Sequence, residues 1–554
     1  MPQWSTACTD WADRLKSGRS IIPPPIFPEQ AEQALAIFRE LKIVDAPGSP
    51  TFGESCAPWV FDLVASIFGA YDPTSGRRLI TEWFVLIPKK NSKSTIAAGI
   101  MMTALVLNWR QSAEYTILAP TIEVAGNSFA PSRDMVQREP ELDTLMHVQT
   151  HIKTITHRVS NASLKVVAAD SNTVSGKKSV GTLVDELWLF GKQADAENMF
   201  REALGGLASR PEGFVIYLTT QSDEPPAGVF KQKLDYARKV RDGEIKDPSF
   251  VPVIFEHPPE MVAAKEHLKL ENLPMVNPNL GFSVDEAWLE REYHKAQAEG
   301  EAALIGFLAK HGNVEIGINL RSDRWAGADF WQRNSQAVTL ERILTECDTI
   351  EIGIDGGGLD DMLGFAVLGR RPEDGLWLHW GCAWIHPIAL ERRKSEASRY
   401  EDFKRDGDLI LVDRPGDDVD QVVDLVSRVE ASNKLDKIGV DPAGIGAIVE
   451  ALEDIGIPQD RIVGIPQGWR LNGAIKTCER KLAADELHHQ GSPLMAWCVG
   501  NCRVEQRGNA ISVTKAASGY AKIDPIAALY NAATLLSMAP APSVIGADYE
   551  LMTI

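Results

Sequence analysis

The sequence predicts an α/β protein with two domains, and three observations lead to this prediction. The chain has 554 residues, 44% of them hydrophobic, which is more than one ordinary hydrophobic core accommodates. In its first part, short and nearly continuous apolar runs alternate with helical patterns, as in a mostly parallel sheet covered on both faces. A second strand-rich region begins at Thr349, after a charged and helical stretch at about 231–335 that is poor in strand patterns. We therefore expect a mostly parallel sheet in the first domain and a second α/β domain behind it.

The limits of the expected segments follow from these patterns. An N-terminal helical segment, interrupted by three consecutive prolines, covers residues 1–57. The first α/β domain with its connector covers 58–335, and the second domain covers 336–540. Residues 541–554 are expected to form a flexible tail.

Composition and charge exclude several classes of protein. The formal net charge of −19 argues against a general nucleic-acid coat protein, because phosphate binding requires Lys and Arg. It leaves room for an enzyme that holds DNA in a local groove. The seven cysteines include no CxxC pair, so we expect reduced thiols and no zinc site. The start of the chain has no signal-peptide pattern and no apolar window long enough for a membrane span, which indicates a soluble intracellular protein.

A basic loop between a predicted strand and a predicted helix is the first candidate site. The helix is expected at Ser94–Leu107, directly after the loop. Backbone N–H groups at a helix N-terminus attract a phosphate, Lys93 adds a full positive charge, and the Ser94 hydroxyl is placed to ligate Mg²⁺. Against the pattern GxxxxGK[ST], however, Ile87 and Ser92 stand at the two glycine positions. The loop alone is therefore as compatible with a basic helix cap as with a phosphate-binding loop.

Two further strand ends carry polar residues in the order that nucleotide hydrolysis requires. One apolar run ends in Asp185 and Glu186, and we place it beside the strand that enters the basic loop. There Asp185 would support Mg²⁺ through water, and Glu186 would orient the attacking water. The next apolar run ends in Thr219, Thr220 and Gln221, which are placed to sense the γ-phosphate. Each feature alone is an ordinary polar strand end, but the three in this order favour a nucleotide-hydrolysing motor.

Aspartates at apolar boundaries mark a second candidate site, in the second domain. Asp355 ends a strand before a glycine turn, Asp441 ends another strand, and Asp524 starts a long apolar helix. Isolated carboxylates at such places are usually solvated or capping residues. Together in one α/β domain they fit an RNase H-like centre in which two Mg²⁺ or Mn²⁺ ions activate a water and stabilise the leaving 3′-oxygen. Asp361, after the glycine turn, is a further candidate ligand.

At these motifs the chain resembles the large subunit of tailed-bacteriophage terminases, in the HK97-like branch. The segment RRLITEWFVLIPKKNSKSTIAAG looks like the family's phosphate-loop pattern, in which a basic residue precedes KNGKS, with Ser92 here in place of Gly. LVDELW resembles the family's acidic strand motif, and TTQ resembles its coupling motif. MVNPNLGFSVDEAWL and DRWAGADFW resemble its connector. The resemblance runs from about Pro58 to Ala533.

The resemblance implies an ASCE-type P-loop ATPase followed by an RNase H-like nuclease. Such a protein would hydrolyse ATP with Mg²⁺ to move double-stranded DNA into a procapsid, and would cleave concatemeric DNA by two-metal hydrolysis. The implied partners are the portal protein, a small terminase subunit and further copies in a homo-oligomeric ring, with no membrane. The implied location is the host cytoplasm, with transient binding to the procapsid portal and absence from the mature virion.

The resemblance also assigns residues to each site. Those assigned to the nucleotide and its Mg²⁺ are Lys89, Asn91, Ser92, Lys93, Ser94, Thr95, Asp185, Thr219, Thr220 and Gln221, with Glu186 as the catalytic carboxylate. Those assigned to the nuclease are Asp355, Asp441 and Asp524, with Asp361 as an additional metal ligand.

Some residue roles stay open in the sequence. Val60 stands where the family's adenine-side segment, here APWVFDLVASIFG, usually has Gln, so another group would recognise adenine. Arg77 and Arg78 are candidates for an arginine finger, in cis or from a neighbouring subunit, and equally for a solvated basic turn. Residues that would lie near DNA phosphates, around a hairpin at Gly508-Asn509, are Arg503, Arg507, Lys515 and Lys522.

Two other classes of function stay open as well. A DNA helicase or translocase without nuclease activity predicts that Asp355, Asp441 and Asp524 do not cluster. A non-enzymatic capsid-associated structural protein with vestigial motifs predicts no ATP turnover.

Overall fold

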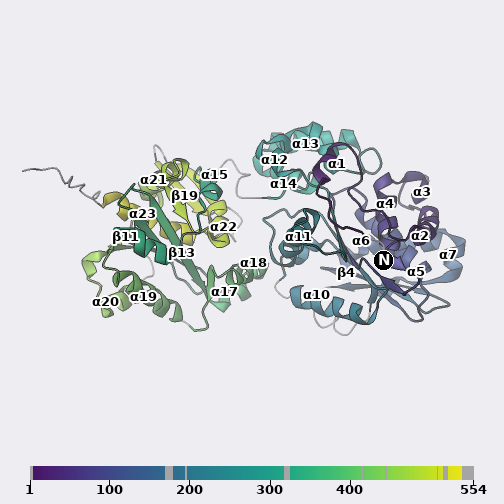
Figure 1. Cartoon of the computed structure of the whole chain (residues 1–554), viewed down its shortest axis with the longest axis horizontal. Helices are drawn as coiled ribbons and strands as arrows, with labels where there is room; N and C mark the ends of the chain where they lie inside the picture. The colour runs from purple at the N-terminus through teal and green to yellow at the C-terminus, as the bar shows by residue number, and fades with distance from the viewer. Residues whose placement is uncertain are drawn as a thin grey trace, which may run out of the picture. The chain divides into compact units, whose positions relative to one another are not determined.

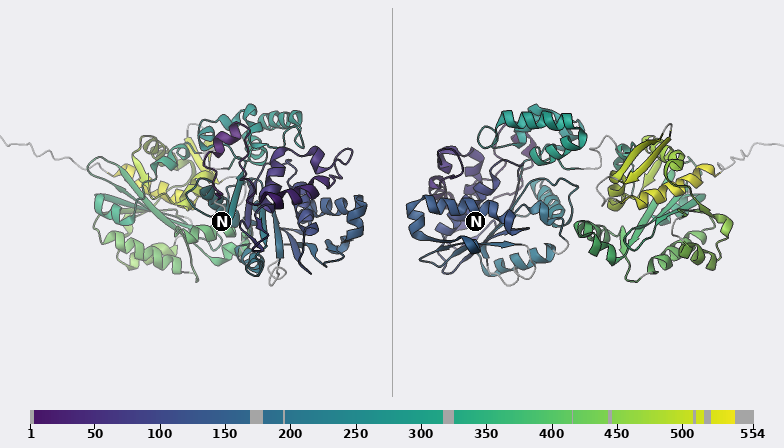
Figure 2. Two further views of the ribbon diagram at one scale, coloured as in Figure 1. Left: turned by 45° about the vertical axis from the view of Figure 1, so that its right-hand side comes forward. Right: turned by 180° about the vertical axis from the view of Figure 1, so that it is seen from behind.

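The chain divides into two units, Met1–Ile316 and Gly317–Ile554, and each is described by itself. The structure, a computed structural model, describes residues 4–168, 179–193, 196–316, 325–414, 416–442, 446–507, 510–515 and 522–539. The predicted tail at 541–554 and the predicted turn at 508–509 lie outside these ranges. Figures 1 and 2 show the helices and strands of each unit. Within the described ranges, none of the helices is both long and apolar enough to span a membrane.

The first unit is built on an eight-stranded sheet with the strand order β10-β3-β9-β8-β4-β7-β6-β5. Strand pairs run parallel from β10 to β7, and β6 and β5 are added antiparallel at one edge. The predicted mostly parallel sheet is therefore confirmed. Its strands are β3 (Glu82–Leu86), β4 (Glu114–Ala119), β5 (Met146–Gln149), β6 (Thr154–His157), β7 (Ser163–Ala168), β8 (Ser179–Asp185), β9 (Phe214–Thr219) and β10 (Phe250–Ile254). A separate short pair joins β1 (Tyr71–Asp72) to β2 (Arg77–Arg78).

Helices cover both faces of this sheet, as continuous apolar strands require. Along β3, Trp83 and Val85 point into one hydrophobic core and Phe84 and Leu86 into the other. The helices are α1 (Trp11–Lys16), α2 (Pro28–Glu40), α3 (Phe52–Ser55), α4 (Pro58–Phe68), α5 (Lys93–Val106), α6 (Ile122–Arg138), α7 (Pro140–Leu145), α9 (Leu187–Phe190), α10 (Ala196–Gly205), α11 (Gly228–Arg241), α12 (Pro259–Ala263), α13 (Glu286–Glu299) and α14 (Glu301–His311). The N-terminal helices belong to this unit, because Phe38 of α2 packs against Gly99 of α5 so closely that a Cβ there would lie 2.8 Å from the ring.

The structure corrects two expectations for this sheet. The stretch at about 231–335, assigned to helices and connector, contributes β10, which forms the sheet edge beside β3. Pro252 in its middle obscures the strand pattern, and an edge strand tolerates Pro because one of its sides needs no ladder partner. The strand that ends in Asp185 is not beside the strand that enters the basic loop, because β9 lies between them. Thr219, at the end of β9, is therefore next to both.

The second unit contains a mixed sheet with the order β14-β13-β12-β11-β15-β16, and β17 pairs with β13. β11, β12 and β13 are antiparallel, whereas β15 and β16 continue parallel to β11. The predicted RNase H-like α/β fold is confirmed by this sheet and the helices around it. The strands are β11 (Thr349–Gly356), β12 (Leu363–Arg370), β13 (Trp377–Ile385), β14 (Leu409–Leu411), β15 (Leu435–Val440), β16 (Ile462–Gly464) and β17 (Leu487–His489), with the hairpin β18 (Cys502–Arg507) and β19 (Ala510–Lys515).

The helices of the second unit include one that lies directly on the sheet. They are α15 (Ala328–Trp331), α16 (Leu340–Glu346), α17 (Pro387–Arg392), α18 (Lys394–Arg405), α19 (Asp417–Glu430), α20 (Gly446–Asp454), α21 (Asn472–Ala483), α22 (Pro493–Asn501) and α23 (Asp524–Met538), with the short 3₁₀ turn η7 (Gly468–Leu471). Figures 1 and 2 show α23 lying along the strands near β11.

Glycines in the strands bring α23 close to the sheet. A Cβ at Gly353 of β11 would overlap a carbonyl oxygen of α23, and one at Gly364 of β12 would lie 2.6 Å from the carbonyl oxygen of Asp524. Asn531 of α23 also donates a hydrogen bond to the carbonyl oxygen of Ile354 at 2.9 Å. The helix start, with Asp524, is thereby held over the end of β11.

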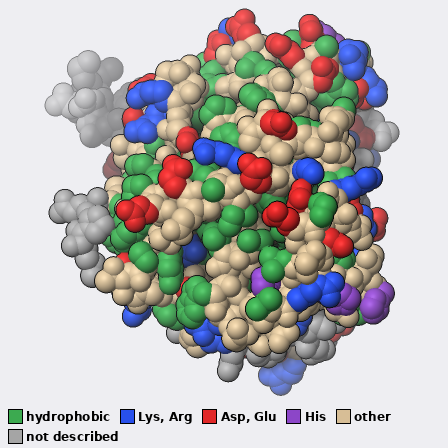
Figure 3. Space-filling view, turned by 90° about the vertical axis from the view of Figure 1, so that its right-hand side faces the viewer, with side chains coloured by type: hydrophobic (Ala, Val, Ile, Leu, Met, Phe, Trp, Pro, Cys, Tyr) green, Lys and Arg blue, Asp and Glu red, His purple; other side chains and the backbone are tan. Residues whose placement is uncertain are grey.

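Charged side chains of both signs lie side by side on the face shown in Figure 3. The chain has 57 Lys and Arg against 76 Asp and Glu, so basic groups have many acidic neighbours available. A site for polyanionic DNA therefore has to be sought in local groups of residues and not in a general basic surface.

Candidate functional site

The basic loop between β3 and α5 contains two residues with left-handed backbone conformations shortly before the helix begins. Lys90 and Ser92 both have left-handed backbone conformations, with φ values of 73° and 52°. Glycine adopts this conformation without a steric penalty, whereas other residues need support from their surroundings. Ser92 therefore keeps the geometry for which the pattern has Gly, and α5 starts directly after it with Lys93.

Asparagines from a distant segment supply the support for this loop. The Asn91 side chain is fully buried and donates to the Oδ1 of Asn277 at 2.9 Å. Asn279 donates its backbone N–H to Asn91 Oδ1 and its side-chain amide to the Asn91 carbonyl oxygen, both at 3.0 Å. The indole of Trp59, at the start of α4, in turn donates to Asn279 Oδ1 at 2.8 Å. Asn277 and Asn279 thus act as a clamp on the loop, a role that the sequence analysis did not assign to them.

Lys93 lies inside the loop among acidic groups. Its side chain is buried, and the ammonium donates to the carbonyl oxygen of Pro88 at 3.2 Å. Burial lowers the pKa of Lys93 to about 8, although the nearby carboxylates of Glu186 and Asp185 act in the opposite direction. The structure therefore brings Lys93 and the acidic pair together, as the sequence predicts. Ser94 and Thr95 are half-buried in the first turn of α5.

The acidic pair ends β8 in two different environments. Asp185 is buried and accepts a hydrogen bond from the Ser128 hydroxyl of α6 at 2.6 Å. Burial raises the pKa of the Asp185 carboxyl to about 6. Glu186 is half-buried, has a left-handed backbone with φ 53°, and accepts a hydrogen bond from the Trp188 indole at 2.6 Å. The two carboxylates therefore have different hydrogen-bond partners, Ser128 for Asp185 and Trp188 for Glu186.

The TTQ segment joins the loop strand to the acidic strand. The carbonyl oxygen of Thr219 accepts from the Ile87 N–H at 3.0 Å, and its hydroxyl accepts from the Trp188 N–H at 3.1 Å. Thr220 and Gln221 are fully buried, and the Gln221 N–H donates to Asn313 Oδ1 at 3.2 Å. This segment therefore contacts the basic loop, the turn after the acidic pair and the segment after α14.

Lys310, at the end of α14, is a further cation beside these groups. Its ammonium donates to the Gln221 carbonyl oxygen at 3.1 Å and lies 3.4 Å from the centroid of the Trp188 ring. Its carbonyl oxygen accepts from the Lys89 N–H at 2.7 Å. Burial lowers the pKa of Lys310 to about 8. The sequence analysis missed Lys310, because its place in this site depends on contacts between distant segments.

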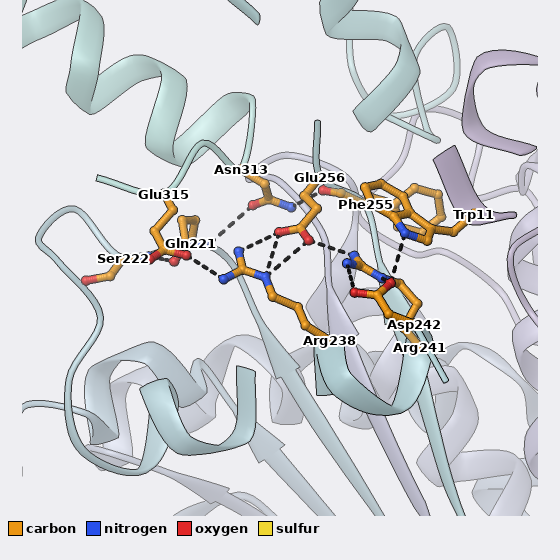
Figure 4. A network of polar contacts seen from close by, with 10 residues as sticks. All are labelled: Trp11, Gln221, Ser222, Arg238, Arg241, Asp242, Phe255, Glu256, Asn313 and Glu315. Atoms are coloured by element: carbon orange, nitrogen blue, oxygen red, sulfur yellow. Dashed lines mark hydrogen bonds and ion pairs between the residues drawn. The ribbon is translucent and has the colours of Figure 1, made fainter. Parts of the chain in front are cut away.

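Figure 4 shows a polar network that continues from Gln221 through Asn313. The Asn313 side chain donates to the carbonyl oxygen of Phe255 at 2.8 Å. The next residue, Glu256, accepts from Arg238 at 2.6 Å and from Arg241 at 2.7 Å. Arg238 also pairs with Glu315 at 2.6 Å. The end of β10 and helix α11 are thereby connected to the last residues of the first unit.

A cavity of about 250 Å³ opens beside the first turn of α5. It is lined by Thr95, by Ile43, Val44 and Asp45, and by the α6 residues Gly126, Asn127, Ala130, Pro131, Asp134 and Met135. Val60, at the position where the family usually has Gln, is 0% exposed and therefore does not reach a nucleotide. Any group that recognises adenine has to come from elsewhere.

Arg77 and Arg78 lie at the opposite end of β3 from the basic loop. Arg78 donates to the carbonyl oxygens of Ile67 and Glu212 and lies over the Phe214 ring at 4.9 Å. The five residues of β3 separate both arginines from the loop by roughly 16 Å. An arginine finger that acts in cis from this turn is therefore excluded. Arg77 is exposed, and its role toward a neighbouring subunit stays a prediction.

The aspartates of the second unit line one cleft of about 290 Å³. The members are Asp355, Asp361, Asp441 and Asp524. Asp355 ends β11 and Asp441 follows the neighbouring parallel strand β15, with the Asp441 N–H donating to the Ile354 carbonyl oxygen at 3.3 Å. Asp524 reaches the same cleft from α23. Asp355, Asp441 and Asp524 therefore lie together, whereas the alternative of a helicase without nuclease activity predicts that they do not.

A lysine shares this cleft with the carboxylates. Lys522 is buried, pairs with the Asp361 carboxylate and donates to the Asp360 carbonyl oxygen at 3.4 Å. In the part of the chain that the structure describes, no group of three or more His, Cys, Asp or Glu side chains is arranged so that these side chains alone could hold a metal ion. Oxygen-only donors around an open cleft suit Mg²⁺ or Mn²⁺, whose sites are completed by water and substrate. Of the predicted DNA contacts, the side chains of Arg507 and Lys515 lie outside the described residues.

Two family models match successive parts of the chain, and the second match begins within the first unit. Residues 58–239 match the family described as "Terminase large subunit, ATPase domain", and residues 247–539 match "Terminase large subunit, endonuclease domain". The chain belongs to the terminase large subunit family. This terminase subunit therefore carries an ATPase and an endonuclease in one polypeptide, the two activities of a motor that packages DNA and cuts concatemers. It uses a nucleotide and divalent metal, and it acts on DNA during packaging.

Individual proteins and solved structures are also similar to this chain. The "Terminase, large subunit" of Enterobacteria phage HK97 is 23% identical over 464 residues, which cover 83% of this terminase chain and 84% of that protein. "Protein YmfN" of Escherichia coli (strain K12) is 25% identical over 240 residues, 41% of this chain and 50% of that protein. Among solved structures, the HK97 bacteriophage large terminase has a TM-score of 0.49 at 19% identity, covering 91% of this chain and 99% of that one. The large terminase of a thermophilic bacteriophage has a TM-score of 0.31 at 14% identity, covering 84% and 95%.

Proposed function

We propose that ATP and Mg²⁺ bind at the loop between β3 and α5 and that the aspartate cleft cuts DNA with two Mg²⁺ or Mn²⁺ ions. The observation that carries the first part is the convergence of Lys93, Asp185, Glu186 and Thr219 from separate segments. The convergence of the four aspartates on one cleft carries the second. The domain limits 58–335 and 336–540 and the roles given below belong to the proposal.

In the ATPase, each residue has a role that follows from its place. Loop N–H groups at Lys90 to Ser92 and the Lys93 ammonium would hold the β- and γ-phosphates, whereas the Lys89 N–H already donates to the Lys310 carbonyl oxygen. The Ser94 hydroxyl and the Asp185 carboxylate would hold Mg²⁺, which would neutralise phosphate charge when bound. Glu186 orients the attacking water, because it is the less buried of the two carboxylates.

The nucleoside is proposed to lie in the cavity beside Thr95. This cavity continues from the first turn of α5, on the side of Thr95. Asp45 and Asp134 are acceptors suited to ribose hydroxyls, and Val44 and Met135 offer an apolar surface to the base.

Thr219, Thr220 and Gln221 are proposed to couple loss of the γ-phosphate to movement. Thr219 contacts both the loop strand and the turn after Glu186, so a shift on either side reaches it. Gln221 passes such a shift to Asn313 through a direct hydrogen bond.

In the nuclease, Asp355, Asp441 and Asp524 would hold the metal ions. The bound ions supply an activated water and stabilisation of the leaving 3′-oxygen. Asp361, already paired with Lys522, would orient that lysine toward the scissile phosphate and contact metal only as an additional ligand. Without cations the carboxylates repel one another, so metal binding and order in the cleft are coupled.

The assembly is proposed to follow the family pattern. Copies of the chain would form a ring on the portal protein in the host cytoplasm, with a small terminase subunit selecting double-stranded DNA. Arg77, exposed at the far end of β3, is the candidate finger toward a neighbouring copy.

Paired variants test the proposal against its alternatives. Wild type, Lys93→Ala and Asp355→Ala are compared for phosphate release from ATP and for nicking of plasmid DNA with Mn²⁺. We expect Lys93→Ala to lose phosphate release and Asp355→Ala to lose nicking. Equal nicking by wild type and Asp355→Ala refutes the aspartate site and favours a translocase without nuclease. Absence of ATP turnover in wild type, on a procapsid with its portal, favours the structural alternative.

A further inference from the structure

An exposed tryptophan stands at the rim of the aspartate cleft. Gln467 and Gly468, at the start of η7, line the cleft together with the aspartates. The next residue, Trp469, has 56% of its surface exposed. A large aromatic side chain left in water next to a site is a candidate binding surface, because it loses unfavourable hydration when a ligand covers it.

The rim is fixed to the strand that carries Asp355. Gln467 donates to Asn531 Oδ1 at 3.0 Å, and Asn531 donates to the Ile354 carbonyl oxygen, one residue before Asp355. On the other side of η7, Asn472 accepts a backbone N–H of β19 at 3.0 Å. The indole is therefore carried by a short segment that is held at both ends.

A cation lies beside this indole. The guanidinium carbon of Arg470 is 5.5 Å from the Trp469 ring centroid. Arg470 is exposed, and among the described residues no carboxylate pairs with it. In a chain with a net charge of −19, such a cation is available to a phosphate.

The ATPase unit contains a pair of the same composition with a different electrostatic environment. Trp109 is 61% exposed, and the Arg110 guanidinium lies 5.0 Å from its ring centroid. Arg110, however, is paired with Glu212 at 2.5 Å. Both pairs have an exposed indole, but Arg110 is paired with Glu212. The pair at the cleft differs in two ways: no carboxylate among the described residues pairs with Arg470, and the proposed cutting site lies next to it.

We propose that Trp469 and Arg470 bind the DNA strand beside the bond that is cut, with the indole stacked on a base and the guanidinium on a neighbouring phosphate. This inference rests on the proposed nuclease function. Bases inside an intact duplex are covered by their neighbours, so stacking requires a strand that is locally opened or single-stranded. The substrate class is therefore DNA with an unpaired or frayed segment at the cleft.

The binding test uses the full chain and a fluorescein-labelled single-stranded oligonucleotide, with Ca²⁺ as the metal. Trp469→Ala is expected to weaken binding about 5- to 100-fold, as loss of one base–aromatic stack does, and Trp469→Phe to restore most of the affinity. Arg470→Ala is expected to reduce the slope of log K against log salt by about 0.7. Trp109→Ala is the matched control and leaves the affinity unchanged.

Cleavage of the same oligonucleotide with Mn²⁺ separates this surface from the metal site. Trp469→Ala is expected to raise KM far more than it lowers kcat, whereas Asp524→Asn abolishes turnover. If Trp469→Ala and wild type bind the oligonucleotide equally, the inference is overturned even when the nuclease is active. If binding depends on Trp469 and wild type does not cut, the nuclease proposal fails and the binding surface stands. If Trp469→Ala unfolds at the same temperature as wild type, its lower affinity for the oligonucleotide comes from the lost indole and not from a change in the fold.

Discussion

The two sites of this terminase subunit are stabilised in opposite ways. In the ATPase, Lys93 lies among the acidic residues Asp185 and Glu186, and the asparagine clamp holds its loop by hydrogen bonds within the protein. In the nuclease, aspartates line one cleft, and Lys522 neutralises one of them, Asp361. The loop of the first site is thus held by contacts within the protein, whereas the second site gathers like charges whose repulsion the proposed cations would relieve.

The comparison predicts that each site fails separately. Asp524→Asn removes a charged ligand from the cleft, so we expect nicking with Mn²⁺ to fall about 1000-fold, while phosphate release from ATP stays at the wild-type rate. Glu186→Gln is the reciprocal control, with phosphate release lost and nicking retained. A parallel loss of both activities in either variant would contradict the independence of the two sites.

Loss of the clamp is expected to damage the ATPase as severely as some direct contacts. Asn279→Ala leaves the Trp59 indole and the Asn91 carbonyl without their partners, each in a buried place. Unmade buried hydrogen bonds of this kind cost about 1–3 kcal/mol each, so kcat/KM for ATP should fall about 10- to 100-fold. Asn272→Ala is the control in the same segment, because within the described ranges its amide donates to the part-buried carbonyl oxygen of Glu266, outside the clamp. Equal kinetics for the two variants would show that the loop keeps its shape without the clamp.

Metal binding is expected to stabilise the nuclease unit and not the ATPase unit. At a concentration about 100 times Kd, one Mn²⁺ adds about 2.7 kcal/mol to the free energy of unfolding of the unit that binds it. Scanning calorimetry with Mn²⁺ and with EDTA measures this shift. In EDTA, Asp355→Asn should unfold at a higher temperature than wild type, because one repelling charge is gone. If Asp355→Asn unfolded at a lower temperature than wild type in EDTA, this result would contradict repulsion between the carboxylates in the cleft.

A buried glutamate gives the nuclease unit a pH dependence of its own. Burial and the nearby Asp436 raise the pKa of Glu351, on β11, to about 8. The pKa of Glu351 is higher in the folded state than in the unfolded state. Its contribution to the free energy of unfolding is therefore fully present below about pH 4.5 and is lost as pH rises through about 8. We expect wild type to lose about 1–2 kcal/mol of stability between pH 7 and 9, and Glu351→Gln to lose less. Urea unfolding at both pH values measures the difference, and identical losses would refute this assignment.

Local patterns were sufficient to predict strands such as β8, β9 and β11 and the polar residues at their ends, although they missed β10. Asp355, Asp441 and Asp524 each end or begin an apolar element, and elements of one α/β sheet bring such ends together. Ser92 could be assigned to the loop although the pattern has Gly there, because the strand pattern before it and the helix pattern after it fix the limits of the loop. Their chemical roles remain predictions.

Features that depend on long-range contacts could not be predicted. The hydrogen bonds of Asn91 with Asn279 join residues far apart in sequence, and no local pattern distinguishes them from a polar turn. β9 lies between β3 and β8 in the sheet. Apolar runs along the sequence predict that strands exist but not the order in which they lie side by side. Asn277 and Asn279 are visible in the sequence as polar residues within an apolar stretch, but this pattern does not show that they contact Asn91.

Asn313 has a consequence for how this motor responds to force. It holds Gln221 of the coupling segment, and Glu315, two residues later, is anchored by Arg238 just before the chain leaves the first unit. A nucleotide state that displaces Gln221 would therefore also displace Asn313 and, through it, the ion pair of Glu315 at the end of the first unit. By thermodynamic linkage, a force that displaces Glu315 would in turn change the affinity for ATP, so mechanical load would regulate ATP use without a separate sensor.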